Sequence, residues 1–140
     1  MHPRHVYANI HYSDDTTSYR NGFMNRSELI LKMVLSEISD DYENVDQIVL
    51  PVVARECAKL GFVVERSEIV GAMAELINDG LAKAYLLSSW APPKELQGMP
   101  LLDVVERDFE TYFYITKKGM DQHLSDDTWW PFDDQGQPLR

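Results

Sequence analysis

Hydrophobic side chains recur at helical spacing in three successive segments of the chain. Between Ser27 and Ile38 they stand three and four positions apart, which predicts an amphipathic helix. A second stripe extends from Val45 to Leu60, and a third from about Ser67 to Asp79. The pattern therefore predicts three helices, each with one apolar face.

Residues that start and stop helices flank these stripes. Asn25, Asn44 and Ser67 are N-cap residue types directly ahead of apolar positions, and the first two are followed three residues on by Glu or Gln. Gly61 and Gly80 follow the last apolar residues and suit left-handed helix stops.

Pro51 falls inside the second stripe and leaves two alternatives open. It kinks a continuous helix by removing one hydrogen bond, or it is the first residue of a shorter helix that ends at Leu60.

Two strand patterns follow the third helix. Leu81–Leu87 alternates apolar and polar positions, and Thr111–Ile115 is aromatic and β-branched, so the two segments are expected to pair antiparallel. The connection from Ser88 to Glu110 holds three prolines and a glycine, so its first part is expected to be irregular. Thr116 is placed to cap a closing helix that reaches Leu124.

These elements predict an α+β fold with three helices, a two-stranded hairpin with a long connection, a short C-terminal helix and an aromatic tail. Residues 1–25 form an arm that is partly ordered or adds an edge strand at Val6–Tyr12, where polar and apolar residues alternate. Residues 26–124 form the domain, and residues 125–140 are expected to pack on it.

The helix order, the Asp79-Gly80-Leu81 junction after the third helix, and the Tyr-Ile-Thr-x-x-Gly step after the last strand resemble the winged-helix superfamily, with a pattern like that of MarR-like and PadR-like regulators. The resemblance covers roughly residues 26–124. It implies that the third helix would enter the major groove if DNA were the ligand. It also allows a protein partner, because winged-helix domains are used for protein binding as well.

Charge changes that picture. The 140 residues include 13 basic and 23 acidic side chains, for a net charge of −10 and a pI of about 4.7. The third helix and its start, from Glu65 to Asp79, carry one arginine against four carboxylates, and the connection from Ser88 to Glu110 is acidic too. Phosphate binding requires Lys and Arg, so this balance disfavours DNA.

Protein contact is therefore the favoured mode, and it has two groups of candidate residues. Glu68 and Glu75 are expected on the solvent side of the third helix, where reversing both to lysine is expected to be nearly neutral for folding. Aromatic residues are enriched at interface hot spots, which makes candidates of Trp90, Trp129, Trp130 and Phe132. The alternative for the tail rings, which we favour, is that the tail folds back and buries them.

Catalytic and metal chemistry find little support in the sequence. His2 and His5 lie in the arm with no carboxylate motif around them, and Cys57 falls on an apolar stripe as an inert buried thiol. Phosphate-binding, nucleophile-elbow and metalloprotease motifs are all missing from the sequence. We therefore expect no enzyme activity, no cofactor and no metal.

The sequence predicts a cytoplasmic, non-enzymatic winged-helix module that binds a protein partner or itself and has no membrane segment. One cysteine fits a reducing compartment, and no apolar run has the length of a membrane span. The alternative is a DNA-binding transcriptional regulator that acts as a homodimer.

Overall fold

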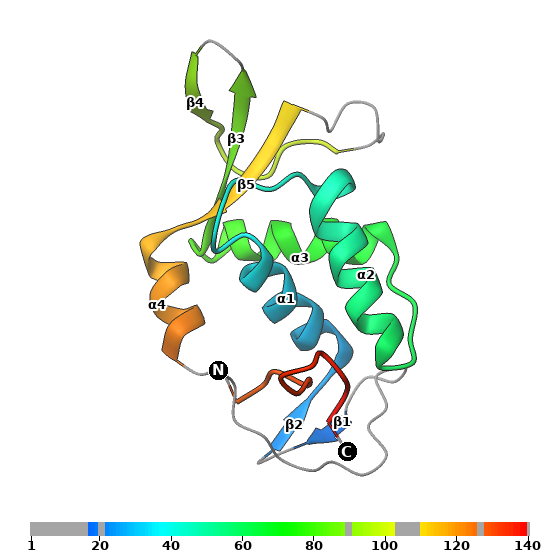
Figure 1. Cartoon of the computed structure of the whole chain (residues 1–140). Coiled ribbons are helices and arrows are strands. Elements are labelled where there is room, and N and C mark those ends of the chain that lie inside the picture. Colours follow the sequence, from blue (N-terminus) through cyan, green and yellow to red (C-terminus); the bar gives the residue numbers. More distant parts are fainter. Residues whose placement is uncertain (1–16, 20–21, 89–90, 103–109, 126–127, 140) are drawn as a thin grey trace.

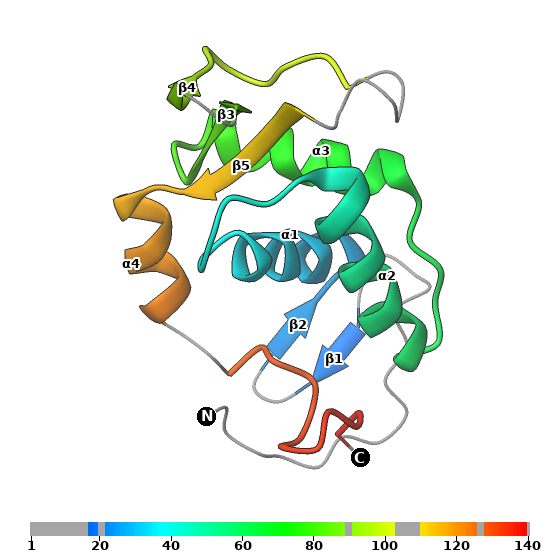
Figure 2. The ribbon, with the colours of Figure 1, turned by 45° about the horizontal axis from the view of Figure 1, so that its top comes forward.

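The computed structural model describes residues 17–19, 22–88, 91–102, 110–125 and 128–139. In these ranges the chain has an α+β fold in which helices pack beneath an antiparallel sheet (Figure 1). Figure 2 shows the sheet on one side of the central helix and the C-terminal segment on the other. The α+β class is as the sequence predicts.

Helix α1 (Arg26–Glu37) supplies the centre of the core. Its predicted apolar stripe is confirmed, because five side chains that recur at helical spacing are at most 3% exposed: Leu29, Ile30, Met33, Val34 and Ile38. Asn25 caps the helix as predicted, and its Oδ1 accepts a hydrogen bond from the Glu28 N–H at 2.8 Å.

The second helical segment changes its winding before Pro51. Asn44 caps a π-helical turn over Val45–Val49, and helix α2 (Leu50–Lys59) follows without a break. Pro51 therefore lies in the first turn of α2, on a helical path that begins earlier. The wider π turn accommodates the proline ring, which would clash with the carbonyl four residues back in a regular helix.

Helix α3 (Arg66–Asn78) begins two residues earlier than predicted. Its N-cap is Glu65 and not Ser67, and the backbone N–H of Glu65 donates to Glu68 Oε1 at 3.0 Å. A carboxylate three residues on can thus complete the start of a helix without a serine at the cap. The helix ends as predicted, because Gly80 takes a φ of 77° directly after the C-cap Asp79.

The sheet is larger than the predicted two-stranded hairpin. Strands β3 (Ala82–Ser88) and β5 (Thr111–Ile115) pair antiparallel as expected, from Ala82 opposite Ile115 to Leu86 opposite Thr111. In the described part of the chain, β4 (Ala91–Glu95) pairs with the other side of β3, which gives the order β4-β3-β5.

The expectation of an irregular start to the connection is therefore wrong over Ala91–Glu95. The register shifts between Leu86 and Ser88, opposite the part of β4 that contains Pro92 and Pro93. An edge strand needs backbone N–H donors only on the side that faces its neighbour. Where the register shifts, fewer of these donors are required. For this reason β4 tolerates two prolines.

The link between α1 and α2 adds one more pairing to the sheet. Glu43 and Phe113 exchange two backbone hydrogen bonds of 2.9 Å, so Glu43 extends the sheet beyond β5. The neighbouring Asn44 is buried, and its Nδ2 donates to the Thr111 carbonyl at 3.0 Å. The start of the second helical segment is thus joined to β5.

Helix α4 (Lys117–Ser125) closes the fold. Thr116 caps it as predicted, because its Oγ1 accepts from the Gly119 N–H at 3.0 Å. Gly119 lies so close to β3 that a Cβ there would overlap the Leu81 carbonyl and stand 2.7 Å from Ile115 Cγ1. The absence of a side chain at Gly119 lets α4 approach the sheet.

The C-terminal tail packs against α2. Trp129, Phe132 and Leu139 are buried, Lys59 Nζ donates to the Gly136 carbonyl at 3.3 Å, and the same ammonium lies 5.5 Å from the Phe132 ring centre. Asp133 orders the turn by accepting hydrogen bonds at 2.9 Å from two backbone N–H groups, those of residues 135 and 137.

The N-terminal arm contributes a short hairpin that the sequence pattern did not predict. Strands β1 (Thr17–Tyr19) and β2 (Gly22–Met24) pair antiparallel, with Thr17 opposite Met24. The predicted edge strand at Val6–Tyr12 lies outside the described residues.

Candidate functional site

A surface groove runs between α1 and α3, on the side of α3 that faces away from the core. It has a cavity volume of about 240 Å³, and one turn of α1 and two turns of α3 line it: Ser27, Ile30, Leu31, Glu68, Gly71, Ala72 and Glu75. The four α3 residues recur at spacings of three, four and seven, so they form one continuous face of the helix. This face is the one that the winged-helix resemblance assigns to ligand contact.

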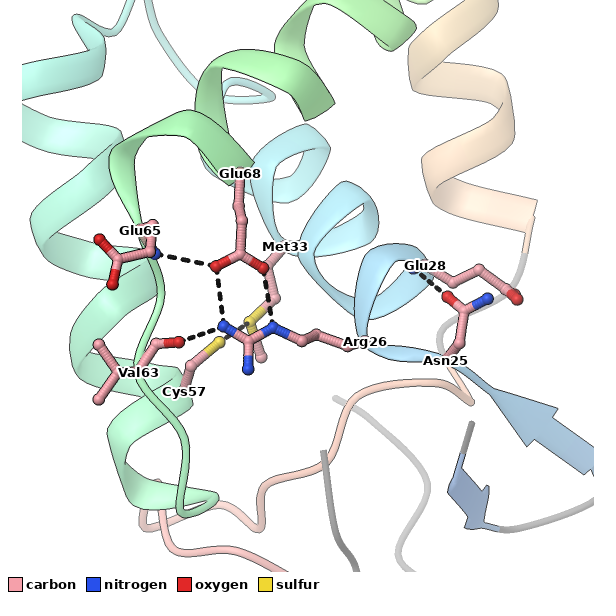
Figure 3. Close-up of polar contacts among 8 residues, drawn as sticks. All are labelled: Asn25, Arg26, Glu28, Met33, Cys57, Val63, Glu65 and Glu68. Atoms are coloured by element: carbon pink, nitrogen blue, oxygen red, sulfur yellow. Dashed lines mark hydrogen bonds and ion pairs between the residues drawn. The ribbon is translucent and has the colours of Figure 1, made fainter. Parts of the chain in front are cut away.

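One end of the groove is closed by an ion pair between the two helices. Arg26 Nε lies 2.8 Å from Glu68 Oε2, and Arg26 Nη2 lies 2.8 Å from Glu68 Oε1, so the contact is bidentate (Figure 3). The same Nη2 donates to the Val63 carbonyl, and the guanidinium lies 4.6 Å from the centre of the Phe62 ring. Arg26 therefore joins the start of α1 to the start of α3.

The ion pair alters the titration of both partners. The hydrogen bonds from Arg26 hold the pKa of Glu68 below its usual value, and the Glu65 N–H adds to that effect. The pKa of Arg26 is raised by the same hydrogen bonds. Glu68 therefore stays ionised in the folded protein at neutral pH, and its charge is matched by Arg26.

A second arginine beside this helix is also held by internal contacts. Arg66 Nε and Nη2 contact the two carboxylate oxygens of Asp46 at 2.6 and 3.0 Å, and Arg66 Nη1 donates to the Leu102 carbonyl at 2.6 Å. The Asp46 side chain is 5% exposed. Both arginines near α3 thus form bidentate ion pairs within the protein, as Arg–carboxylate geometry favours.

The centre of the groove is open at Gly71. This residue is exposed in the middle of α3, and a Cβ built on it meets no atom within 4 Å. Glycine in a helix interior costs roughly 0.5–1 kcal/mol relative to alanine. No packing requirement for a glycine exists among the described neighbours, which sets Gly71 apart from Gly119.

Glu75 ends the groove one turn after Gly71. Its side chain is exposed, and Glu65 and Asp79 are exposed at the two ends of α3. Because Arg26 and Arg66 are engaged by Glu68 and Asp46, the solvent side of α3 presents carboxylates without a basic side chain on the helix to balance them.

A smaller cavity of about 150 Å³ lies between α1, α2 and the tail, and its lining includes Glu37, Glu56 and Trp130. Burial raises the pKa of Glu37, and Arg55 opposes that rise. Glu56 lies 3.5 Å from Lys59 Nζ and 4.0 Å from Arg55 Nε. Cations from α2 therefore already balance the carboxylates of this cavity.

Tyrosines cover the outer face of the sheet. Tyr42 stacks on Tyr114 with ring centres 4.9 Å apart and meets Tyr85 edge-on at 5.0 Å. Burial raises the pKa of Tyr85. These rings pack on one another.

The candidate nucleophile and metal ligands of the sequence do not form a reactive site in the described ranges. Cys57 is fully buried, its Sγ lies 3.7 Å from Met33 Sδ, and burial raises the pKa of its thiol to about 12. Within residues 17–19, 22–88, 91–102, 110–125 and 128–139, no group of three His, Cys, Asp or Glu side chains is arranged to hold a metal. His2 and His5 lie outside these ranges.

Of the predicted contact residues, the structure brings Glu68 and Glu75 together in the groove. Trp129 and Phe132, at 5% and 1% exposure, are core residues, which agrees with the favoured alternative that the tail buries its rings and leaves them unavailable as exposed contacts. Trp130 is half-buried and packs edge-on against both of these rings. Trp90 lies outside the described residues.

Three features of the groove were missed in the sequence. Arg26 contacts a residue 42 positions away, and no local pattern gives that distance. Ile30 was assigned to the apolar stripe of the first helix, and Leu31, which also lines the groove, was assigned to no face. Gly71 did carry a signal, because a glycine at a solvent-side position inside a strong helix pattern is costly without a reason.

The expectation that lysine at both positions 68 and 75 is neutral for folding is wrong at Glu68. Its carboxylate accepts two hydrogen bonds from Arg26 and one from the Glu65 backbone. A lysine would lose all three and place a second cation beside Arg26.

Comparisons of the chain with protein-family models, curated proteins and solved structures give no match. Among the helices in the described ranges, none combines the length and the apolar character needed to cross a bilayer.

Proposed function

We propose that this chain is a winged-helix protein-interaction module of the cytoplasm that works as an accessory regulator and uses the α3 face to bind a protein partner. The observation that carries the proposal is that Arg26 and Arg66, the basic residues at the start of α1 and α3, are both held in bidentate internal ion pairs, which leaves the exposed side of α3 acidic.

The order of elements supports the winged-helix assignment. Three helical segments precede β3, which starts two residues after Gly80; β5 returns alongside β3, and α4 follows. Glu43, in the link between the first and second helical segments, pairs with Phe113 of β5, as a short strand at that place would. The extra strand β4 occupies the region of the wing.

Electrostatics argue against DNA as the ligand. A DNA-binding helix needs side chains that neutralise phosphates and read base edges. On α3, Arg66 is engaged by Asp46, and the exposed positions carry no basic residue: Ser67, Gly71, Glu75 and Asn78. Freeing either arginine would break a bidentate ion pair with a carboxylate, and this cost opposes a switch to phosphate binding.

The chemistry of the cysteine is consistent with the cytoplasm. Cys57 is buried against Met33 and has no second cysteine in the chain. A reduced, packed thiol of this kind suits a reducing compartment.

Two measurements test the proposal. Fluorescence anisotropy with random duplex DNA, over a salt series that starts at low ionic strength, is expected to show no binding. Affinity capture with the wild type and a Gly71→Met variant, followed by quantitative mass spectrometry, is expected to enrich proteins on the wild type alone. Salt-dependent DNA binding, or capture that is identical on both baits, would refute the proposal.

A further inference from the structure

The groove between α1 and α3 has the shape and spacing of a helix-binding surface. Glu68, Gly71, Ala72 and Glu75 form a straight stripe on α3, and Ile30 and Leu31 form an apolar wall on α1. Helices that dock in grooves contact their partner every three or four residues. A groove lined by two helices is therefore a surface along which such a helix can lie.

Gly71 supplies a second and independent observation. The residue sits at the middle of the stripe, and the space around its missing side chain is open. Glycine is favoured where another backbone approaches closely. Since no described segment of this chain fills that space, the backbone of a second molecule can approach α3 closely at Gly71.

Charge selects the kind of molecule. Glu75 faces the groove, and Glu65 and Asp79 lie at the ends of the same helix, all three exposed. Two copies of this chain that met through this face would bring those carboxylates together, which is unfavourable. Basic side chains on a partner would find complementary charge at the Glu75 end of the groove, because Glu68 at the other end is already paired with Arg26.

We propose that the α1–α3 groove binds an amphipathic helix of a partner protein, whose small or apolar residues pack over Gly71 and Ala72 and whose Lys or Arg side chains contact Glu75. This inference rests on the proposed protein-binding function and specifies its partner chemistry.

Arg26 has a positioning role in this site. By pairing with Glu68, it joins the start of α1 to α3 at one end of the groove and balances the charge of that carboxylate (Figure 3). The apolar face of the partner then meets the half-buried Leu31 beside the core residue Ile30, and its basic flank meets the Glu75 end.

The test uses the full chain and three synthetic peptides of about 18 residues, a length at which helix formation becomes favourable. The first has an apolar face flanked by lysines. The second has the same composition in a scrambled order without a helical face, and the third has glutamate in place of each lysine. Binding is followed by backbone amide chemical shifts in ¹⁵N-labelled protein.

The expected result is saturable shifts with the first peptide at Gly71, Ala72, Glu75 and Leu31. Gly71→Met is expected to lower the affinity for this peptide on the order of tenfold or more, because the methionine side chain occupies the space that the partner would fill. Glu75→Lys is expected to lower the affinity for the lysine peptide as well, and to raise the affinity for the glutamate peptide. Ala58→Met adds the same side chain at an exposed position of α2 outside the groove and is expected to leave binding unchanged.

Thermal unfolding of Gly71→Met separates loss of binding from loss of fold. The variant is expected to be at least as stable as the wild type, since its Cβ enters open space and methionine favours helix more than glycine does.

Equal binding of the ordered and scrambled basic peptides, shifts spread over the acidic surface, or unchanged binding to Gly71→Met would overturn the inference, and so would no binding of the basic peptide. If capture of cellular proteins still depends on Gly71, that result leaves the protein-binding function standing with another kind of partner. Salt-dependent DNA binding instead removes the proposed function itself.

Discussion

Two glycines in helices of this protein have opposite surroundings. A Cβ added to Gly71 of α3 would meet open space, whereas a Cβ added to Gly119 of α4 would overlap the Leu81 carbonyl. The two positions share a residue type, but their surroundings differ in whether they require glycine. At Gly119 the close approach of α4 to the sheet requires glycine, and at Gly71 nothing in the described fold does.

Alanine at each position tests that contrast. Gly71→Ala is expected to raise the free energy of unfolding by about 0.5–1 kcal/mol, because it removes backbone entropy from the unfolded chain at no steric cost. Gly119→Ala is expected to lower it by about 1–3 kcal/mol through overlap with β3. Urea unfolding measures both, and equal effects would contradict the two assignments.

A second contrast separates the acidic residues of the groove. Glu68→Lys is expected to lower the free energy of unfolding by about 1–2 kcal/mol, a value that allows for solvent screening of the half-exposed ion pair. Glu75→Lys is the matched control, because its side chain is exposed, and is expected to stay within about 0.5 kcal/mol. Destabilisation by both to the same degree would argue against a special role of Arg26.

The lowered pKa of Glu68 predicts a pH dependence. Its stabilising effect is present above the ordinary value near 4.5 and is lost as the pH falls through the lower pKa of the folded state. Between pH 7 and about pH 3 the wild type is therefore expected to lose more stability than Glu68→Gln. Burial raises the pKa of Glu37 and Glu43, which acts in the opposite direction but equally in both proteins.

Chemical denaturation at the two pH values gives the comparison for Glu68. Glu75→Gln serves as the control and is expected to follow the wild type. A Glu68→Gln variant that loses as much stability as the wild type on acidification would show that the ion pair with Arg26 does not control this titration.

At the scale of whole elements, the start of the second helical segment depends on one buried amide. Asn44 Oδ1 accepts from the Gln47 N–H at 2.9 Å, and its Nδ2 donates to the Thr111 carbonyl. Asn44→Ala is expected to cost about 2–3 kcal/mol, because it removes a cap and leaves a buried carbonyl without that donor. Asn25→Ala removes a cap on the surface and is expected to cost less; thermal unfolding of both variants makes the comparison.

The local features of the elements were readable in the sequence. Apolar spacing gave the buried face of α1 apart from Leu35, and Asn25, Asn44 and Thr116 cap their helices as predicted. Each of these depends on residues within one or two turns of the chain. Strand β4 was missed because its two prolines argue against a strand until the register shift opposite them is known.

Contacts between distant residues explain what the sequence did not supply about the groove. Glu68 and Glu75 share a helix face, so their proximity was predictable from spacing. The pairing of Arg26 with Glu68, and of Arg66 with Asp46, joins residues 42 and 20 positions apart. The charge left on the surface depends on these pairs and could not be counted from composition.

At the scale of the whole molecule, the C-terminal tail is part of the folded unit. Phe132 is 1% exposed and contacts Trp130 and Lys59, so Phe132→Ala is expected to cost about 3 kcal/mol. Leu124→Ala is the control, because that side chain is 72% exposed. Guanidinium unfolding that shows no effect of Phe132→Ala would mean that the tail adds little to the stability of the domain.

The sulfur pair of Cys57 and Met33 has a practical consequence. The thiol is the one cysteine of the chain, it is fully buried between α1 and α2, and its pKa of about 12 keeps the reactive thiolate scarce. A disulfide reagent added to the native protein can therefore react when these two helices separate. The rate at which the reagent modifies Cys57 therefore measures how often α1 and α2 separate in the native protein. The measurement needs no engineered label.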